Sequence, residues 1–263
     1  MCHNDARAYD LINSGPYEKL KHNPAPKVAI ELSRKLNAMQ REGRIPKHMV
    51  KMLQVPDPLC PRFCNLAKTH KKVEQGCDTP PGRPINSQLE AVLAALALWL
   101  TRVFSPLSKK TTHSLRNGHE FVQSIQGLEL HDDEIFTSLD AKAFYPSVPI
   151  DDAIAYCAHV LDQDKGFSSR PLTRDLSKAV VIDLLSFCLS NSYFQFRGEY
   201  YRQVEGGAMG VGIVADLFME SLKVQALSKM AHPPRMWRRY VDDCWAVIRE
   251  IHFEDMFKHE QAA

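Results

Sequence analysis

The chain has 263 residues, 44% of them hydrophobic and 24% charged, which is ordinary for a globular protein of one large or two small lobes. The longest apolar run, residues 91–100, is too short to span a bilayer, and the N-terminus lacks a secretory signal pattern. We therefore expect an intracellular protein without membrane contact.

Seven cysteines at scattered spacings agree with a reducing compartment rather than a disulfide framework. A zinc site at Cys60, Cys64, His70 and Cys77 is an alternative, although these spacings do not match the common ligand pairs.

Charge is divided unevenly along the chain. Residues 1–118 hold 19 Lys and Arg against 9 Asp and Glu, whereas residues 119–263 hold 14 against 22. A basic segment favours a polyanionic partner, and an acidic one favours cations. The asymmetry therefore favours a nucleic acid as the partner.

The first half combines helices with proline-rich loops. Residues 27–42 carry apolar side chains at helical spacing and precede Gly43, which predicts a helix that ends there. Six prolines between residues 54 and 87 predict loops and short strands. Residues 88–104 are strongly apolar and predict a helix that Pro106 stops.

The second half begins with a strand. Residues 134–139 read as a short buried strand that ends at Asp140. We expect Asp151 or Asp152 to cap a helix that continues to about residue 161, and Thr173 to cap another that continues to about residue 190.

Hairpins and a further helix follow. Residues 193–202 alternate around Arg197-Gly198, which predicts a hairpin, and residues 217–230 read as a helix. Tyr240-Val241-Asp242-Asp243 lies between two strand-like segments and is predicted to form the bend of a second hairpin. Helices on one face of an antiparallel sheet define the predicted fold class, α+β.

Asp140, Asp242 and Asp243 are candidate metal ligands. Adjacent carboxylates are poor strand formers, and a divalent cation would offset their repulsion. Two-metal phosphoryl transfer uses carboxylates that bridge two ions about 3.5–4 Å apart, and Mg²⁺ takes its other ligands from water and substrate phosphates. A solvated turn or a helix cap is the alternative for each residue.

These carboxylates belong to an ordered series of motifs. Residues 140–149 (Asp-Ala-Lys-Ala-Phe-Tyr-Pro-Ser-Val-Pro) resemble motif A of reverse transcriptases. Glu205-Gly206-Gly207-Ala208-Met209-Gly210, running on to Leu217-Phe218-Met219-Glu220, resembles motif B, and Tyr240-Val241-Asp242-Asp243 resembles motif C. Upstream, Leu66-Ala67-Lys68-Thr69-His70-Lys71 and Arg83-Pro84-Ile85 resemble the finger motifs. Residues 17–21, 68–71 and 191–203 point to Penelope-like retroelements, a branch related to telomerase reverse transcriptase.

The resemblance covers about residues 17–250 and implies a right-hand polymerase. Its fingers would lie within a basic region, residues 1–130, and its palm within residues 131–263, with the two interleaved and the thumb absent. The implied activity is that of an RNA-directed DNA polymerase, which extends a DNA primer on an RNA template with deoxynucleoside triphosphates, in the nucleus.

The resemblance also implies site residues. Two Mg²⁺ or Mn²⁺ ions would be held by Asp140, Asp242 and, less directly, Asp243. One ion would lower the pKa of the primer 3′-hydroxyl, and the other would hold the triphosphate and the leaving pyrophosphate.

Other residues match positions that contact the incoming nucleotide. Lys68 and Arg83 match the finger positions that clamp the triphosphate, and Tyr145 matches the steric gate that excludes a 2′-hydroxyl. Ala208-Met209-Gly210 would let the backbone approach the template base and the nucleotide closely. The alternatives are solvated cations, a core aromatic ring and a flexible loop.

The sequence departs from the family in three respects. Motif B is about three residues short after Gly210, a Lys-Asp-Lys-Gly element is missing near the N-terminus, and the sequence ends about twenty residues after Asp243, before the thumb and GIY-YIG nuclease of many relatives. We therefore expect a truncated or degenerate copy with weak or no activity. A catalytically inactive nucleic-acid-binding remnant is the alternative.

Overall fold

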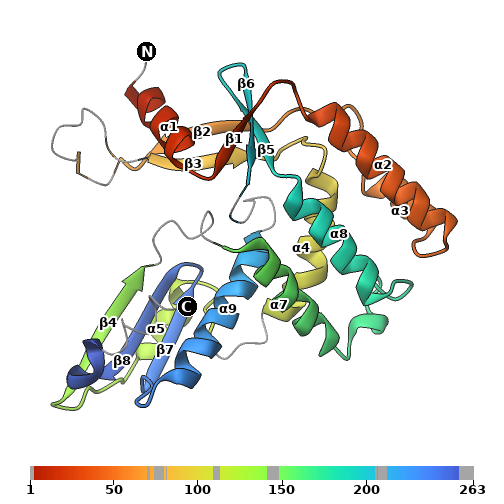
Figure 1. The fold of residues 1–263 in the computed structure, drawn as a ribbon. Coiled ribbons are helices and arrows are strands. Elements are labelled where there is room, and N and C mark those ends of the chain that lie inside the picture. Colours follow the sequence, from red (N-terminus) through yellow and green to blue (C-terminus); the bar gives the residue numbers. More distant parts are fainter. Residues whose placement is uncertain are drawn as a thin grey trace.

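The structure is a computed structural model, and it describes residues 3–69, 72–73, 80, 82–108, 113–140, 148–204, 206 and 212–254. Within these residues, a five-stranded sheet and a three-stranded sheet lie at two ends of the molecule, with a group of helices between them (Figure 1).

The larger sheet combines strands from both halves of the chain. Its strand order is β1-β6-β5-β2-β3, and all its pairs are antiparallel except β2–β5. The strands are β1 (Tyr17–Leu20), β2 (Arg62–Ala67), β3 (Gly82–Ser87), β5 (Tyr193–Phe196) and β6 (Glu199–Gln203). Helix α1 (His3–Ser14) buries Ala8 and Ile12 in the same cluster as aromatic residues of β2, β5 and β6.

The β5–β6 hairpin confirms the bend predicted at Arg197-Gly198. Both residues have positive φ, 50° and 82° respectively. A two-residue turn with two left-handed positions matches the twist of paired strands, and glycine adopts such a position without strain.

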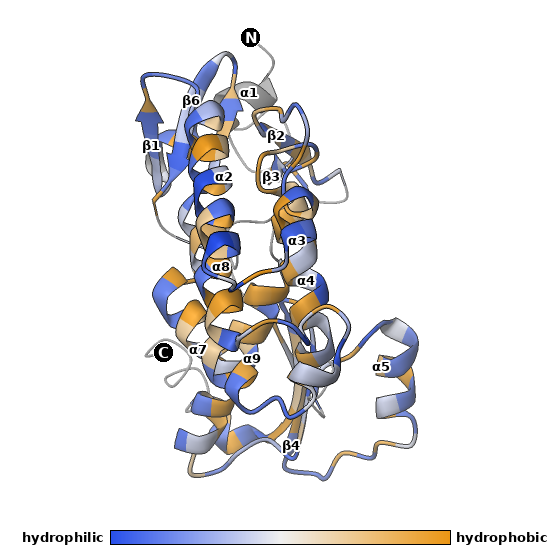
Figure 2. Cartoon of the chain, turned by 90° about the vertical axis from the view of Figure 1, so that its right-hand side faces the viewer, coloured by the Kyte–Doolittle hydropathy of each residue, from blue (hydrophilic) through white to orange (hydrophobic). Residues whose placement is uncertain are grey.

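The helices between the sheets contain the main hydrophobic core. They are α2 (Ala25–Arg41), α3 (Lys47–Met52), α4 (Ala94–Ser108), α7 (Ile150–Asp162), α8 (Lys178–Ser190) and α9 (Gly212–Lys229). Figure 2 shows hydrophobic residues gathered on α4, α7 and α8 in the middle of the molecule. The helix predicted from residues 27–42 is confirmed as α2, and Gly43 follows it with φ 70°.

The prediction that Pro106 stops its helix was wrong, because α4 continues through Pro106 to Ser108. A proline inside a helix costs about 3 kcal/mol or more, chiefly through one lost hydrogen bond and a steric clash. Phe104 and Leu107 are both buried, and burying such a side chain contributes about 1.5–3 kcal/mol. Their burial offsets the cost of the last turn. The start was also misplaced, since α4 begins at Ala94 rather than residue 88.

The two predicted caps were also wrong. Pro149 precedes α7 as its N-cap, so Asp151 and Asp152 lie in the first turn, where carboxylates favour the helix dipole. Ser177 caps α8 by accepting a hydrogen bond from the Val180 amide at 3.3 Å. Thr173 is buried instead, and its hydroxyl donates to the Phe167 carbonyl beside the 3₁₀ helix η1 (Phe167–Ser169).

The smaller sheet has the order β4-β8-β7 and is wholly antiparallel. It contains β4 (Glu134–Asp140), β7 (Met236–Tyr240) and β8 (Asp243–Arg249), and η3 (Glu250–His252) follows it. These strands confirm the two strand segments predicted around Asp140 and around Tyr240. The expected burial of residues 134–139 was wrong, because β4 lies at the edge of the sheet and Phe136 is 41% exposed. On one face, Leu227 of α9 and Met230, which directly follows this helix, pack against a cluster that contains Trp237 and Ile248. The helix predicted from residue 217 begins five residues earlier, at Gly212.

The opposite face of this sheet contacts a short helix, α5 (Gly118–Ile125). The Phe121 ring lies 4.4 Å from the Trp245 ring and 6.5 Å from Phe136, measured between ring centroids. The predicted α+β class is confirmed. Among the described residues, the structure has no helix that is long and apolar enough to cross a membrane.

Candidate functional site

The sheet register brings the three predicted metal ligands to one end of the smaller sheet. Asp140 ends β4 and Asp243 begins β8, and the two are paired Cα partners in the β4–β8 ladder. Such partners lie about 4.5–5.5 Å apart. Asp242 belongs to the two-residue turn between Tyr240 and Asp243, which also form a pair. The backbone therefore allows the three carboxylates to share a site.

The donor types suit a magnesium site. Three carboxylates offer the hard oxygen ligands that Mg²⁺ prefers. The structure describes the backbone of Asp140 but not its side chain, while Asp242 is half-buried and Asp243 exposed. No group of three His, Cys, Asp or Glu in the described part of the chain is placed to hold a metal ion. Because the Asp140 side chain lies outside the described part, the ligand roles stay predictions.

Val241 occupies a strained position in this turn, since its φ is 55°. A β-branched residue rarely adopts the left-handed region, and the cost is on the order of 1–3 kcal/mol. Val241 is 36% exposed, so burial of its side chain does not compensate fully. Surrounding contacts must hold this backbone conformation.

Arg239 supplies such a contact from inside the protein. It is 1% exposed, and its Nη1 donates to the Val241 carbonyl at 2.8 Å and to Asp216 Oδ1 at 2.6 Å. A hydrogen bond that involves a charged group contributes about 1.5–3 kcal/mol, which is comparable to the strain at Val241. The hydrogen bond from Arg239 therefore offsets the energetic cost of the Val241 conformation.

Helix α9 provides the charges that allow Arg239 to be buried. Besides the Asp216 carboxylate, Nη2 contacts the Asp216 carbonyl at 3.2 Å and Glu220 Oε2 at 3.8 Å. Glu220 and Lys223 form a buried ion pair one turn further along. Removing one member of a buried pair costs about 3–5 kcal/mol because the remaining charge is uncompensated.

The sequence did not predict the contacts of Arg239 with Asp216 and Glu220. The signals were the i, i+4 spacing of the two carboxylates among the apolar residues of α9, and an arginine within a buried strand. Neither pattern reveals its partner, because 23 residues separate Arg239 from Asp216.

The two cations predicted to clamp the triphosphate lie at a pair of adjacent strands. Lys68 directly follows β2 and is half-buried, and Arg83 lies in β3 as the partner of Leu66. The hairpin register therefore places their backbones at the same end of the larger sheet. The side chain of Arg83 is outside the described part.

Several other candidates lie outside the described residues. These are the steric-gate candidate Tyr145 and the motif B segment Ala208-Met209-Gly210. His70 and Cys77 of the alternative zinc site are also outside it. Burial raises the pKa of the Cys60 thiol to about 11.

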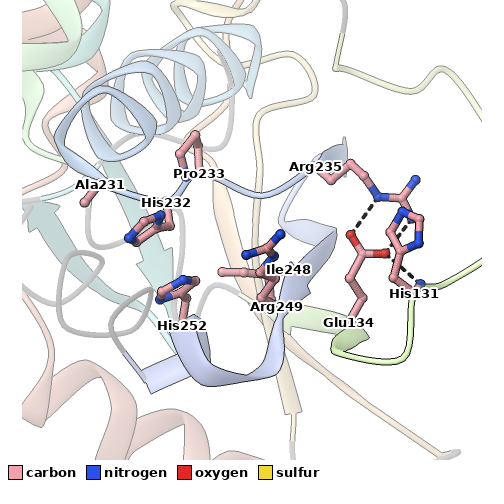
Figure 3. A pocket seen from close by; sticks show the side chains of 9 residues that line it. All are labelled: His131, Glu134, Ala231, His232, Pro233, Arg235, Ile248, Arg249 and His252. Carbon is pink, nitrogen blue, oxygen red and sulfur yellow. Dashed lines mark hydrogen bonds and ion pairs between the residues drawn. The ribbon is translucent and has the colours of Figure 1, made fainter.

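A pocket of about 370 Å³ lies at the opposite end of the smaller sheet. Its walls include His232 and His252, whose rings are stacked at 3.9 Å, and Arg235, which points to Glu134 (Figure 3). Glu134 and Arg249 sit at the ends of β4 and β8 away from Asp140 and Asp243. Seven residues of strand extend about 20 Å, so this pocket is separate from the carboxylates.

Comparison with known proteins identifies the fold. No protein-family model matches the chain, and no curated protein matches it. Its fold is that of the palm and fingers of template-dependent nucleic-acid polymerases, as solved structures of such enzymes show.

Three solved chains illustrate this similarity. Apo telomerase from Candida tropicalis, truncated from its C-terminal domain, matches with a TM-score of 0.51 and 12% identity over 89% of this chain and 52% of that one. Telomerase from Candida albicans in complex with a TWJ fragment of telomeric RNA matches with a TM-score of 0.51 and 13% identity, over 89% of this chain and 44% of that one. The BmCPV RNA-dependent RNA polymerase at quiescent state matches with a TM-score of 0.51 and 12% identity, over 98% of this chain and 23% of that one. The chain thus spans about half or less of these solved chains.

Proposed function

We propose that this chain is the reverse transcriptase domain of a Penelope-like retroelement, an RNA-directed DNA polymerase that acts in the nucleus. The observation that carries this proposal is the pairing of Asp140 with Asp243 beside the Asp242 turn, within a polymerase fold. The motifs of the sequence support the narrower assignment to reverse transcription.

In this proposal, Asp140 and Asp242 hold two Mg²⁺ or Mn²⁺ ions, and Asp243 assists them from the start of β8. The bound ions would activate the primer 3′-hydroxyl and neutralise charge on the triphosphate. The protein's own contribution to phosphoryl transfer is then positioning and electrostatic stabilisation. The β4–β8 ladder suits this task because the paired strands hold Asp140 and Asp243 at a set spacing.

The remaining roles follow from the same proposal. Lys68 and Arg83 clamp the triphosphate, Tyr145 excludes ribonucleotides, and Ala208-Met209-Gly210 lies against the template base and the nucleotide. The fingers are assigned to residues 1–130 and the palm to residues 131–263. Interleaving of the two is supported by β5 and β6, which join the larger sheet although they follow β4 in the chain.

Primer extension tests the proposal directly. The full chain is incubated with a DNA primer on an RNA template, deoxynucleoside triphosphates and Mg²⁺ or Mn²⁺. We expect Asp242→Asn to lower the extension rate at least about 100-fold, because metal-assisted charge stabilisation is worth several kcal/mol. Asp175→Asn, at a side chain that is 69% exposed, is the matched control and should keep the wild-type rate.

Extension that survives Asp242→Asn would contradict the assigned site. Parallel reactions with a DNA template and with ribonucleotides decide whether the polymerase is RNA-directed and makes DNA. A preference for ribonucleotides on RNA would instead indicate an RNA-dependent RNA polymerase.

The second candidate function is a catalytically inactive nucleic-acid-binding remnant, which the basic first half of the chain favours. Lys and Arg contacts to phosphates release counterions, so binding by such a remnant weakens steeply as salt rises. Binding of this kind without extension, and unaffected by Asp242→Asn, would support the remnant over the polymerase.

A further inference from the structure

Resting on the proposed function, we propose that Arg239 is a positioning residue that sets the orientation of Asp242 by holding the Val241 carbonyl, and that α9 anchors it through Asp216 and Glu220.

The hydrogen bond from Arg239 to Val241 acts on the peptide unit that directly precedes Asp242. The Val241 carbonyl belongs to the peptide unit that joins Val241 to Asp242, and this unit is planar. A donor that fixes the carbonyl therefore fixes the plane from which the Asp242 backbone continues. Arg239 Nη1 donates to this carbonyl at 2.8 Å. The positive φ of Val241 is the conformation that this contact retains.

Arg239 is itself held from two sides. Its backbone amide donates to the His113 carbonyl at 2.9 Å, and its carbonyl accepts from the Leu115 amide at 2.7 Å. Its guanidinium is held by Asp216, through both the carboxylate and the backbone carbonyl, on α9. The donor that fixes the turn is thus attached to a helix and to a neighbouring segment, rather than to the hairpin alone.

An arginine is required for this geometry. Its planar fork reaches a carboxylate and a carbonyl at once, whereas the ammonium of lysine is a compact point charge on a flexible stem. Arg239→Lys therefore keeps the buried positive charge, which protects the fold, but loses the defined contact to Val241. This variant separates positioning from charge balance.

The chain contains a matched control. Arg170 donates from Nη1 to the Val103 carbonyl at 3.1 Å and pairs with the buried Asp164 through Nη2. It has the same pattern of contacts as Arg239, a carboxylate and a main-chain carbonyl, but it lies among the helices and not at the turn. Arg170→Lys reports what the loss of such a network does to stability alone.

The experiment compares wild type, Arg239→Lys and Arg170→Lys as full chains in three measurements. These are the thermal midpoint, the affinity for Mn²⁺ from electron paramagnetic resonance of the free ion, and hydrogen exchange of peptides that contain residues 240–243. We expect both variants to lower the midpoint. Only Arg239→Lys should speed hydrogen exchange at the turn. Only this variant should also weaken Mn²⁺ binding, with an affinity lowered about tenfold or more, as is typical when a residue that orients a metal ligand is lost.

Recovery of extension activity at high Mn²⁺ concentration adds a readout that a purely structural role of Arg239 would not change. Raising the Mn²⁺ concentration should restore part of the activity of Arg239→Lys and none of any loss in Arg170→Lys. The inference is overturned if Arg239→Lys leaves turn exchange unchanged, or if Arg170→Lys changes turn exchange and Mn²⁺ affinity equally. Turn exchange is measured without primer or nucleotide, so a wild type that does not extend a primer favours the inactive remnant over the polymerase and leaves this test intact.

Discussion

Val241 shows how a single backbone angle reports on function. Its φ of 55° is costly for a β-branched side chain, and the residue lies between Tyr240 and the candidate ligand Asp242. Strain of this kind persists only where the surrounding structure holds it, and it concentrates at functional sites. The turn could have been built more stably with asparagine or glycine, so its strain is consistent with a site shaped for chemistry.

Replacing Val241 by asparagine should stabilise the protein, by about 1 kcal/mol, because asparagine tolerates the left-handed region. The free energy of unfolding from urea titration measures this gain. Val224→Asn is the control, at a side chain that is 54% exposed in α9, and it should bring no gain since its φ is not positive. Equal losses in the two variants would mean that Val241 is not strained.

The β4–β8 ladder carries different chemistry at its two ends. Asp140 and Asp243 pair at one end, whereas Glu134 pairs with Arg249 in register at the other. There Arg235 forms a bidentate contact with Glu134, at 2.7 Å for both nitrogen–oxygen pairs. This hydrogen-bonded guanidinium, helped by the His131 amide, lowers the pKa of Glu134 to about 2. The pair ties β4 to the segment that enters β7.

The Glu134 contact should make stability depend on pH in a defined window. A carboxyl with a lowered pKa in the folded state stabilises the protein above its unfolded pKa of about 4.5, and this contribution is lost as pH falls toward about 2. Glu134→Gln should therefore lower the free energy of unfolding at pH 7, and the difference from wild type should shrink as pH falls below about 4.5. Urea titrations between pH 3 and 7 measure it.

Arg235→Gln provides the control for this pH effect. In its background, Glu134→Gln should have a much smaller effect, since the guanidinium whose hydrogen bonds lower the pKa of Glu134 is gone. A pH-independent difference between Glu134→Gln and wild type would contradict the assignment.

The whole molecule depends on the helices between its two sheets. The main core draws buried residues from α2, α4, α7, α8 and α9, and α9 also packs on the smaller sheet. The larger sheet has its own aromatic cluster, which is smaller. Because the carboxylate end of the smaller sheet is attached to α9, loosening the helical core should reach the candidate site.

Leu184, which is fully buried in α8, tests this dependence. Leu184→Ala should lower the free energy of unfolding by about 2–5 kcal/mol through lost burial and the cavity left behind. Leu98→Ala, at a 53% exposed position in α4, should change it by less than about 0.5 kcal/mol. Circular dichroism and the fluorescence of Trp99, Trp237 and Trp245 should report one coincident transition. Separate transitions would show that the smaller sheet, which contains Trp237 and Trp245, unfolds independently of the helical core.

Local signals predicted the type of many elements, but not all their limits. Gly43 follows the end of α2 as expected, and Arg197-Gly198 forms the β5–β6 turn. Both signals are local, because glycine lacks a Cβ atom and adopts a positive φ without help from its surroundings. Pro106 and Thr173 failed as signals since their neighbours are buried, and burial outweighed a local preference that favoured another structure. Motif order led to the polymerase fold, although it could not reveal the contacts of Arg239.

The amino-acid sequence by itself determined which side chains are available and where strands must turn, because alternation and turn chemistry act over a few residues. It therefore placed Asp140 at a strand end and Asp242 in a bend. Only the tertiary structure decided that Asp140 lies opposite Asp243, and that a buried arginine anchored on α9 donates a hydrogen bond to the turn between β7 and β8. Strand register and buried ion pairs join residues far apart in the chain, and their partners are set by packing of the whole fold rather than by neighbours in sequence.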